Sequence, residues 1–178
     1  MSSTVHRLFL ALPLTPSAAA QLLQMATSKI PGLDRLTYDP ADLHLTVKFI
    51  GEVESIKVDE VIAAVAPIIS TLAPFKVELK KIQHFPKATS PLIVALAQLS
   101  LPLAAIYRDL NILLAQYGVG AESRAFRPHI TLSNQAKNIK PIEALFYFTF
   151  EASEIALYES NRDKNGIKYQ VLHRFSFQ

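Results

Sequence analysis

Two short stretches of the chain share an alternating pattern of histidine, an apolar residue, threonine and another apolar residue. They are "DLHLTVKFIGEV" at residues 42–53 and "FRPHITLSN" at residues 126–134. Successive side chains of a β-strand point to opposite faces of its sheet, so a strand with one buried face produces this alternation. The pattern predicts two strands, each with an apolar face in the core and a polar face that carries an imidazole beside a hydroxyl.

The polar faces of these two strands would supply acid and base groups. His44, Thr46 and Lys48 are expected on one strand, and His129 and Thr131 on the other, with histidine and threonine about 7 Å apart along each strand. Because the unperturbed pKa of histidine is about 6.5, one imidazole can be neutral while the other is protonated near neutral pH. Two such strands facing each other would surround a small anion with a general base, a general acid and two hydroxyls.

A phosphodiester suits this set of groups. One imidazole can take the proton of an attacking water while the other protonates the departing oxygen, and the threonine hydroxyls can hydrogen-bond the nonbridging oxygens. A strained cyclic diester needs no metal for this reaction. The remaining histidines, His6, His84 and His173, show no spacing typical of metal ligands, so we expect neither a metal nor another cofactor.

The chain length and the order of its elements predict an α+β fold. The 178 residues suit one domain spanning 1–178, or two small lobes that share a cleft, and 50% of them are hydrophobic. Helices are expected at 15–30, at 58–72 with Pro67 kinking or dividing it, and at 103–117 with Gly118 closing it. Strands are expected at 7–14, 33–38, 43–50, 75–82, 91–96, 129–133, 146–150, 154–158 and 168–177, the last two joined by "NRDKNG".

The composition excludes several classes of protein. Without cysteine there is neither a disulfide framework nor a thiolate site, which fits a cytoplasmic protein. No apolar run approaches the roughly 18 residues of a membrane-spanning helix, so a soluble protein is expected. The net charge of +3 comes from scattered basic residues and does not by itself indicate nucleic-acid binding.

Each of these residues also has a structural interpretation that the pattern leaves open. A His-x-Thr strand can be purely structural, and a strand lysine such as Lys48 is often a solvated edge residue. Three arginines are equally consistent with surface charges: Arg7, Arg124 and Arg127. Phe126 is expected in the core and not as a platform for base stacking, and Tyr158 can line the cleft or pack.

Five segments together resemble the two-histidine (2H) phosphoesterase superfamily. They are "HRLFLALPL", "DLHLTVKFIGEV", "RAFRPHITL", "IALYES" and "YQVLHRFSF", and the resemblance runs from Arg7 to Phe177. Within the superfamily, the chain is most similar to the bacterial and archaeal RNA 2',3'-cyclic phosphodiesterases, the LigT-type or 2'-5' RNA ligase family. The resemblance implies a bilobal fold with two antiparallel sheets, flanked by helices, around a central V-shaped cleft.

The resemblance also implies an activity and roles for particular residues. The family hydrolyses RNA 2',3'-cyclic phosphate ends to 2'-phosphomonoesters without ATP or metal, and some members join tRNA halves through a 2'-5' linkage. By this resemblance His44 is the proton donor to the leaving 3' oxygen, His129 is the proton acceptor, and Thr46 and Thr131 hold the phosphate. The expected partners are RNA ends or small nucleotides with a cyclic phosphate, bound by a monomer.

One position departs from the family pattern. The family often continues the second motif as His-x-Thr-x-x-Arg, and here Asn134 stands in place of the arginine. Lys137 or Arg127 is a candidate to replace its charge. Further substrate-binding candidates are Lys48, where many family members also have lysine, Arg7 and Tyr158. Two other functions stay open: a nucleotide-binding or RNA-binding module without useful turnover, and a phosphodiesterase for another small cyclic nucleotide or RNA 3' end.

Overall fold

The computed structural model describes residues 5–120, 125–163 and 166–178, which form an α+β fold. Within these residues eight strands form one antiparallel sheet in the order β6-β3-β4-β5-β2-β1-β7-β8. The strands are β1 (Val5–Pro13), β2 (His44–Glu54), β3 (Phe75–Phe85), β4 (Leu92–Ala97), β5 (His129–Ser133), β6 (Glu143–Ala152), β7 (Glu154–Asp163) and β8 (Gly166–Ser176). The helices are α1 (Pro16–Lys29), α2 (Val58–Ile69) and α3 (Leu101–Ala115), with short 3-10 helices at Leu33–Arg35, Pro40–Asp42 and Ser55–Lys57.

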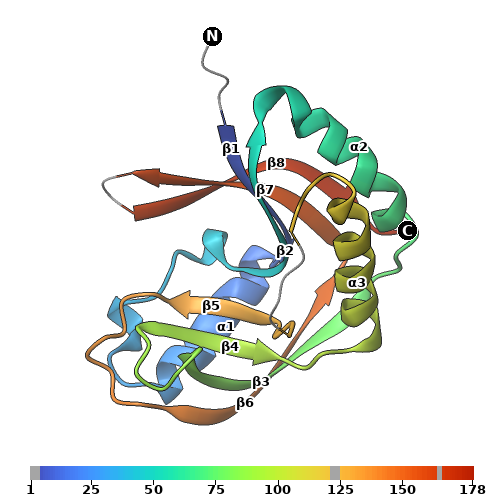
Figure 1. The fold of residues 1–178 in the computed structure, drawn as a ribbon. Helices are drawn as coiled ribbons and strands as arrows, with labels where there is room; N and C mark the ends of the chain where they lie inside the picture. Colours follow the sequence, from blue (N-terminus) through green and yellow to red (C-terminus); the bar gives the residue numbers. More distant parts are fainter. Residues whose placement is uncertain (1–4, 121–124, 164–165) are drawn as a thin grey trace.

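The sheet consists of two four-stranded halves that meet where β2 lies beside β5. The register between these two strands contains the pair Leu45 and Ile130, and both side chains are fully buried. Figure 1 shows the lower half with β3 to β6 and the upper half with β1, β2, β7 and β8. The two sheets that the resemblance implies are therefore the two halves of one curled sheet.

Helices α1 and α3 link the two halves, because each follows a strand of one half along the chain and packs on the other half. Helix α1 follows β1 of the upper half, yet it contacts β6 and lies against the lower half (Figure 1). Helix α3 follows β4 of the lower half and contacts β2, while α2 contacts α3 and β8. Each helix buries an apolar stripe, such as Leu103, Ile106, Leu110 and Leu114 on α3. This packing holds the two halves together, although β2 and β5 are paired over a very short stretch.

Most of the predicted elements are present, with three differences. The predicted connection "NRDKNG" at 161–166 is too long, because β7 extends to Asp163 and β8 begins at Gly166. The predicted strand at 33–38 is wrong, because Leu33–Arg35 is a 3-10 helix and the following residues are irregular. Gly32 precedes this 3-10 helix and has a φ of 83°, in the left-handed region. The chain turns there, and the Leu33 side chain is buried. Pro67 does not divide α2, because it lies in the last turn of a helix that ends at Ile69, three residues before the predicted end. Gly118 follows α3 at φ 78°, as predicted for a residue that closes a helix.

None of the helices in the described residues is long and apolar enough to cross a lipid bilayer.

Candidate active site

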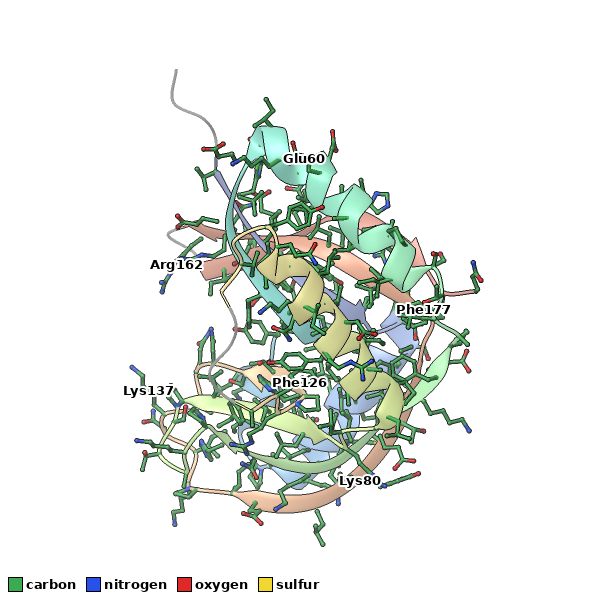
Figure 2. The ribbon with its side chains drawn as sticks, turned by 45° about the vertical axis from the view of Figure 1, so that its right-hand side comes forward. Glu60, Lys80, Phe126, Lys137, Arg162 and Phe177 are labelled. Carbon is green, nitrogen blue, oxygen red and sulfur yellow. The ribbon has the colours of Figure 1, made fainter. Side chains whose placement is uncertain are left out.

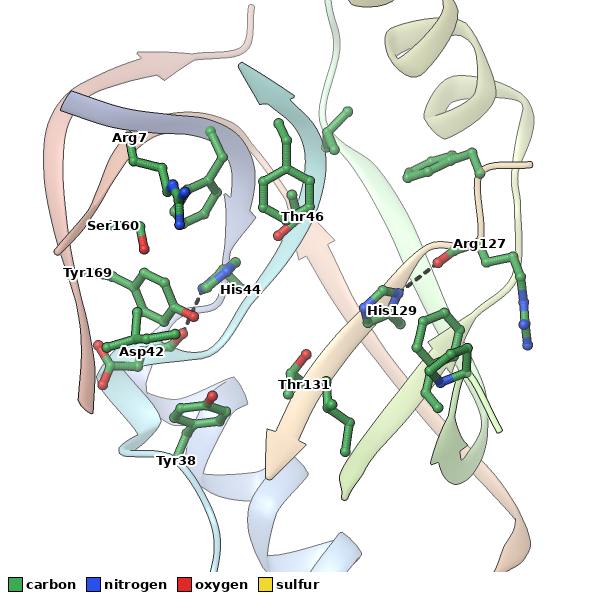
Figure 3. Close-up of a pocket in the computed structure, with 18 of the residues that line it drawn as sticks. Arg7, Tyr38, Asp42, His44, Thr46, Arg127, His129, Thr131, Ser160 and Tyr169 are labelled. Atoms are coloured by element: carbon green, nitrogen blue, oxygen red, sulfur yellow. Dashed lines mark hydrogen bonds between the residues drawn. The ribbon is translucent and has the colours of Figure 1, made fainter. Parts of the chain in front are cut away.

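A cavity of about 540 Å³ opens where the two halves of the sheet meet. This volume lies within the range of small-molecule sites, about 300–1,000 Å³. His44 and Thr46 of β2 and His129 and Thr131 of β5 all line it (Figure 3). The structure thus brings together the four residues of the two His-x-Thr motifs, which are 85 residues apart in the chain (129 minus 44).

The pairing of Leu45 with Ile130 explains this arrangement. In an antiparallel pair, the residues flanking a matched pair face each other crosswise, so His44 lies opposite Thr131 and Thr46 opposite His129. Leu45 and Ile130 point into the core, so their neighbours point to the cavity. Figure 3 draws no hydrogen bond from either threonine hydroxyl to another lining residue. Both motifs therefore present their imidazole and their hydroxyl to the same cavity.

Both imidazoles are held in the same way by the backbone two residues earlier. His44 Nδ1 donates to the carbonyl oxygen of Asp42 at 2.7 Å, and His129 Nδ1 donates to that of Arg127 at 2.8 Å. A carbonyl can only accept, so the proton of each neutral ring is on Nδ1. Nε2 of each ring is left with its lone pair for proton transfer in the cavity.

Burial keeps both histidines neutral in the ligand-free protein. It lowers the pKa of His44 to about 4, and the nearby His129 contributes to the same shift. Burial also lowers the pKa of His129, and the positive charge of Arg127 lowers it further. Because the charge of Arg127 lies beside His129, it favours the neutral form of that ring, the form that a general base requires.

Aromatic side chains pack around each imidazole and fix its plane. The His44 ring lies 5.3 Å from the Tyr158 ring and 4.8 Å, edge-on, from that of Tyr169. On the other side, the Phe85 ring lies 4.5 Å from that of His129. Tyr158 is 5% exposed, stacks on Phe9 and is absent from the cavity lining, so it supports His44 from beneath.

Lys48 does not share the face of His44 and Thr46, contrary to the sequence-based expectation. The register of β2 against β1 shifts at Val47, between the pairs Leu10–Lys48 and Ala11–Thr46. Such a bulge interrupts the alternation of side chains. Lys48 is 1% exposed, lies outside the cavity lining, and its Nζ donates to the carbonyl oxygen of Gly120 at 3.3 Å. Lys48 therefore joins β2 to the segment after α3.

Two arginines line the cavity. Arg7 is largely exposed, with a guanidinium 3.9 Å from the Glu52 carboxylate, and the Arg127 guanidinium lies 4.7 Å from the centre of the Phe85 ring. Lys137 is outside the lining, and Figure 2 shows it on the outer surface. Of the two candidates to replace the family arginine, the structure places Arg127 at the cavity. Arg124 lies outside the described residues.

Position 134 influences the cavity through a tyrosine. Asn134 is exposed and is absent from the cavity lining, but its side chain lowers the pKa of Tyr38, which lines the cavity, and so partly offsets the effect of burial. Phe126, considered above as a core residue, is half-buried, stacks on Tyr107 of α3 at 4.1 Å and also lines the cavity. Figure 2 shows it beneath α3.

The sequence did not reveal a polar cluster beside His44. Tyr38, Tyr169 and Asp42 line the cavity together (Figure 3). Burial, together with the charge of Asp42, raises the pKa of both tyrosines, that of Tyr169 to about 12, so both hydroxyls stay protonated at neutral pH. Tyr38 comes from an irregular segment and Tyr169 from a distant strand, so no periodic pattern links them. The only available signal was that Asp42 lies two residues before His44.

The described residues contain no group of three or more histidine, cysteine, aspartate or glutamate side chains that could hold a metal ion.

Comparison with known proteins agrees with this geometry. A family model described as the 2'-5' RNA ligase superfamily matches residues 14–164. An RNA 2',3'-cyclic phosphodiesterase of Methanocaldococcus jannaschii is 27% identical over 93% of this chain and 98% of its own length. One of Thermus thermophilus is 29% identical over 97% of this chain and 90% of its own.

Solved structures share the fold. A crystal structure from Thermus thermophilus superposes with a TM-score of 0.82 at 25% identity, covering 96% of this chain and 97% of the other. That of E. coli LigT complexed with NADP+ superposes with a TM-score of 0.80 at 24% identity, covering 99% of both chains.

The lowered pKa of His44 predicts a loss of stability in mild acid. In the unfolded chain this ring titrates near 6.5 and in the folded protein near 4, so the unfolded state binds more protons between these values. The stabilising contribution is therefore complete above pH 6.5 and is lost as the pH falls towards 4. Urea unfolding from pH 7.5 to 4.5 should show a dependence on pH that is weaker in His44→Gln, by up to about one proton.

Thr46→Val is the control, because it alters the same cavity without changing a titratable group. It should keep the native dependence of stability on pH. An equal dependence in the native protein and His44→Gln would contradict the lowered pKa.

Proposed function

The chain belongs to the 2'-5' RNA ligase superfamily, and we propose that it hydrolyses RNA 2',3'-cyclic phosphate ends to 2'-phosphomonoesters. One observation carries the proposal: two imidazoles, each with Nδ1 held by a backbone carbonyl, and two threonine hydroxyls line one cavity. The names of the relatives from M. jannaschii and T. thermophilus support the same reaction.

The proposed reaction is a displacement at phosphorus that needs one proton to be removed and another to be supplied. Nε2 of His129 takes a proton from water as the water oxygen bonds to phosphorus. The bond from phosphorus to the 3' oxygen breaks, and Nε2 of His44 protonates that oxygen to give a 3'-hydroxyl and a 2'-phosphate. The water proton taken by His129 and the proton lost by His44 balance, and exchange with solvent restores the starting state. Each transfer contributes roughly 10²- to 10⁴-fold to the rate.

Substrate binding supplies the charge that His44 needs to be an acid. In the ligand-free cavity its pKa is about 4, so it is neutral near pH 7. A bound phosphodiester carries one negative charge, which raises the pKa of adjacent imidazoles. The charge of Arg127 opposes this rise at His129. This effect of Arg127 is consistent with His129 as the proton acceptor, the role that the family resemblance gives it.

The other polar groups of the cavity would orient the nucleotide. The hydroxyls of Thr46 and Thr131 hydrogen-bond the nonbridging phosphate oxygens as their charge rises in the transition state. Arg7 and Arg127 contact phosphates of the RNA beyond the terminal nucleotide. Lys48 and Tyr158 act indirectly, through the packing of β2 and of the His44 ring.

The same site can join two RNA ends. If the 5'-hydroxyl of a second RNA replaces the attacking water, the products are a 2'-5' diester and a free 3'-hydroxyl, with the same two proton transfers. We include tRNA halves among the substrates of this reaction. We further propose that residues 1–178 act as one catalytic unit, as a monomer in the cytoplasm.

Hydrolysis of an oligoribonucleotide with a 2',3'-cyclic phosphate tests the proposal. The native chain should give a 2'-phosphate in EDTA, at a rate that added Mg²⁺ leaves unchanged. His44→Ala and His129→Ala should each lower kcat roughly 10²- to 10⁴-fold. His173→Ala, which removes an exposed histidine on β8 outside the cavity, should keep native activity.

Three results would contradict the proposal. Binding of the RNA end without turnover would indicate a binding module. Turnover of cyclic mononucleotides alone would indicate a different diester substrate. A product with the phosphate on the 3' oxygen would contradict the assigned bond cleavage.

The position of Arg127 predicts which cation replaces the missing arginine at position 134. Arg127→Ala should raise KM for the oligoribonucleotide several-fold, since an exposed ion pair contributes up to about 1 kcal/mol. Lys137→Ala removes the same charge outside the cavity and should leave KM unchanged. Steady-state kinetics at low salt would measure both, and the opposite order of effects would assign the contact to Lys137.

A further inference from the structure

His6, which lies outside the cavity, is placed between a serine hydroxyl and a carboxylate. His6 of β1 approaches Glu159 of β7 with Nδ1 at 2.6 Å from Oε1, and Nε2 of the same ring lies 2.8 Å from the hydroxyl oxygen of Ser55. We propose that Ser55 is a nucleophile activated by His6 and Glu159, which reacts with small activated acyl esters. This would be a second reactive site, with chemistry different from that of the cavity.

Strand geometry separates this serine site from the two-histidine cavity. Arg7 and Ser160 line the cavity, and they are the chain neighbours of His6 and Glu159. Because adjacent residues of a strand point to opposite faces, His6 and Glu159 point away from the cavity. They lie on the face whose core contains Leu8 and Leu157, whereas Phe9 and Tyr158 pack on the cavity face. The sheet itself therefore lies between the two sites.

The order of the contacts assigns each residue a role. Glu159 is 9% exposed and accepts the Nδ1 proton, which fixes the ring with its lone pair on Nε2. In the neutral ring this lone pair faces the hydroxyl of Ser55, 2.8 Å away, and can accept its proton. A hydroxyl, an imidazole and a carboxylate connected in this order form the arrangement that activates a serine nucleophile, recognised by geometry and not by position in the sequence.

The reaction follows from these contacts. The Ser55 oxygen attacks the ester carbonyl while its proton moves to His6 Nε2, and the alcohol leaves with that proton as the acyl-serine forms. Water then attacks the acyl group, again with His6 as base, to release the acid and restore the hydroxyl. Because Ser55 is exposed at the start of the short 3-10 helix Ser55–Lys57, small esters can reach it. Esters with a good leaving group are the expected substrate class.

Covalent labelling of the full chain tests the proposal. A fluorophosphonate probe should attach to Ser55 with loss of fluoride, as located by peptide mass spectrometry. His6→Ala and the isosteric Glu159→Gln should each slow this labelling, the former roughly 10²-fold or more. The peptide with Ser28 is an internal control, because the Ser28 hydroxyl donates to the Met25 carbonyl and contacts no imidazole. p-Nitrophenyl acetate should be hydrolysed by the native chain and not by Ser55→Ala.

Activity on the cyclic phosphate separates this proposal from a loss of folding. Ser55→Ala should keep the native rate on RNA ends, and His44→Ala should keep native labelling of Ser55. Labelling of Ser55 no faster than of Ser28 would overturn the proposal, as would native labelling in both His6→Ala and Glu159→Gln. In either case the three residues would only bridge β1, β7 and the end of β2.

Discussion

The junction between β2 and β5 is the constraint on which both the fold and the candidate site depend. Leu45 and Ile130 pair there, and both side chains lie in the core. A slip of one residue would exchange the faces of a strand and bury an imidazole in place of an aliphatic side chain. The burial of Leu45 and Ile130 therefore fixes the register in which the two His-x-Thr motifs lie opposite each other, histidine against threonine. Helices α1 and α3, which pack across the two halves, keep this short junction in place.

The electrostatics of the cavity suit an anionic substrate. Two imidazoles packed among aromatic rings lose hydration, and this lowers the pKa of both. Reaction requires that the pair hold one proton, and the pKa values then belong to the pair and its ligand together. A phosphodiester supplies the negative charge that stabilises this proton, and the positive charge of Arg127 opposes protonation of His129. The ligand-free state is thus neutral, and the substrate creates the charged state in which it reacts.

The sequence was sufficient to predict the features that depend on local periodicity. The alternation around His44 and His129 predicted two strands with a shared polar face, and the structure places these residues in one cavity. The face of Lys48 could not be predicted, because a register shift opposite β1 changes the alternation within β2. Periodicity describes one strand at a time, whereas a bulge arises from the fit of two.

Contacts between distant segments could also not be predicted from the sequence. Tyr38 and Tyr169 meet only because an irregular segment and β8 approach the same cavity. The contact of His6 with Ser55 and Glu159 likewise joins residues of three different elements, and none of these residues belongs to a recognisable motif. The predicted strand at 33–38 is absent because the chain turns at Gly32 and continues as a 3-10 helix, despite the local preference of these residues for extended backbone.

The central claim, that His44 is the acid and His129 the base, is tested most directly with a cyclic substrate whose leaving 3' oxygen is replaced by sulfur. A thiolate leaves without being protonated, so this substrate does not need the acid. His44→Ala should therefore show its loss of roughly 10²- to 10⁴-fold on the oxygen substrate but be close to native on the sulfur substrate, whereas His129→Ala should show this loss on both. Rescue of His129→Ala in place of His44→Ala would reverse the assignment, and rescue of neither would contradict the two-histidine mechanism.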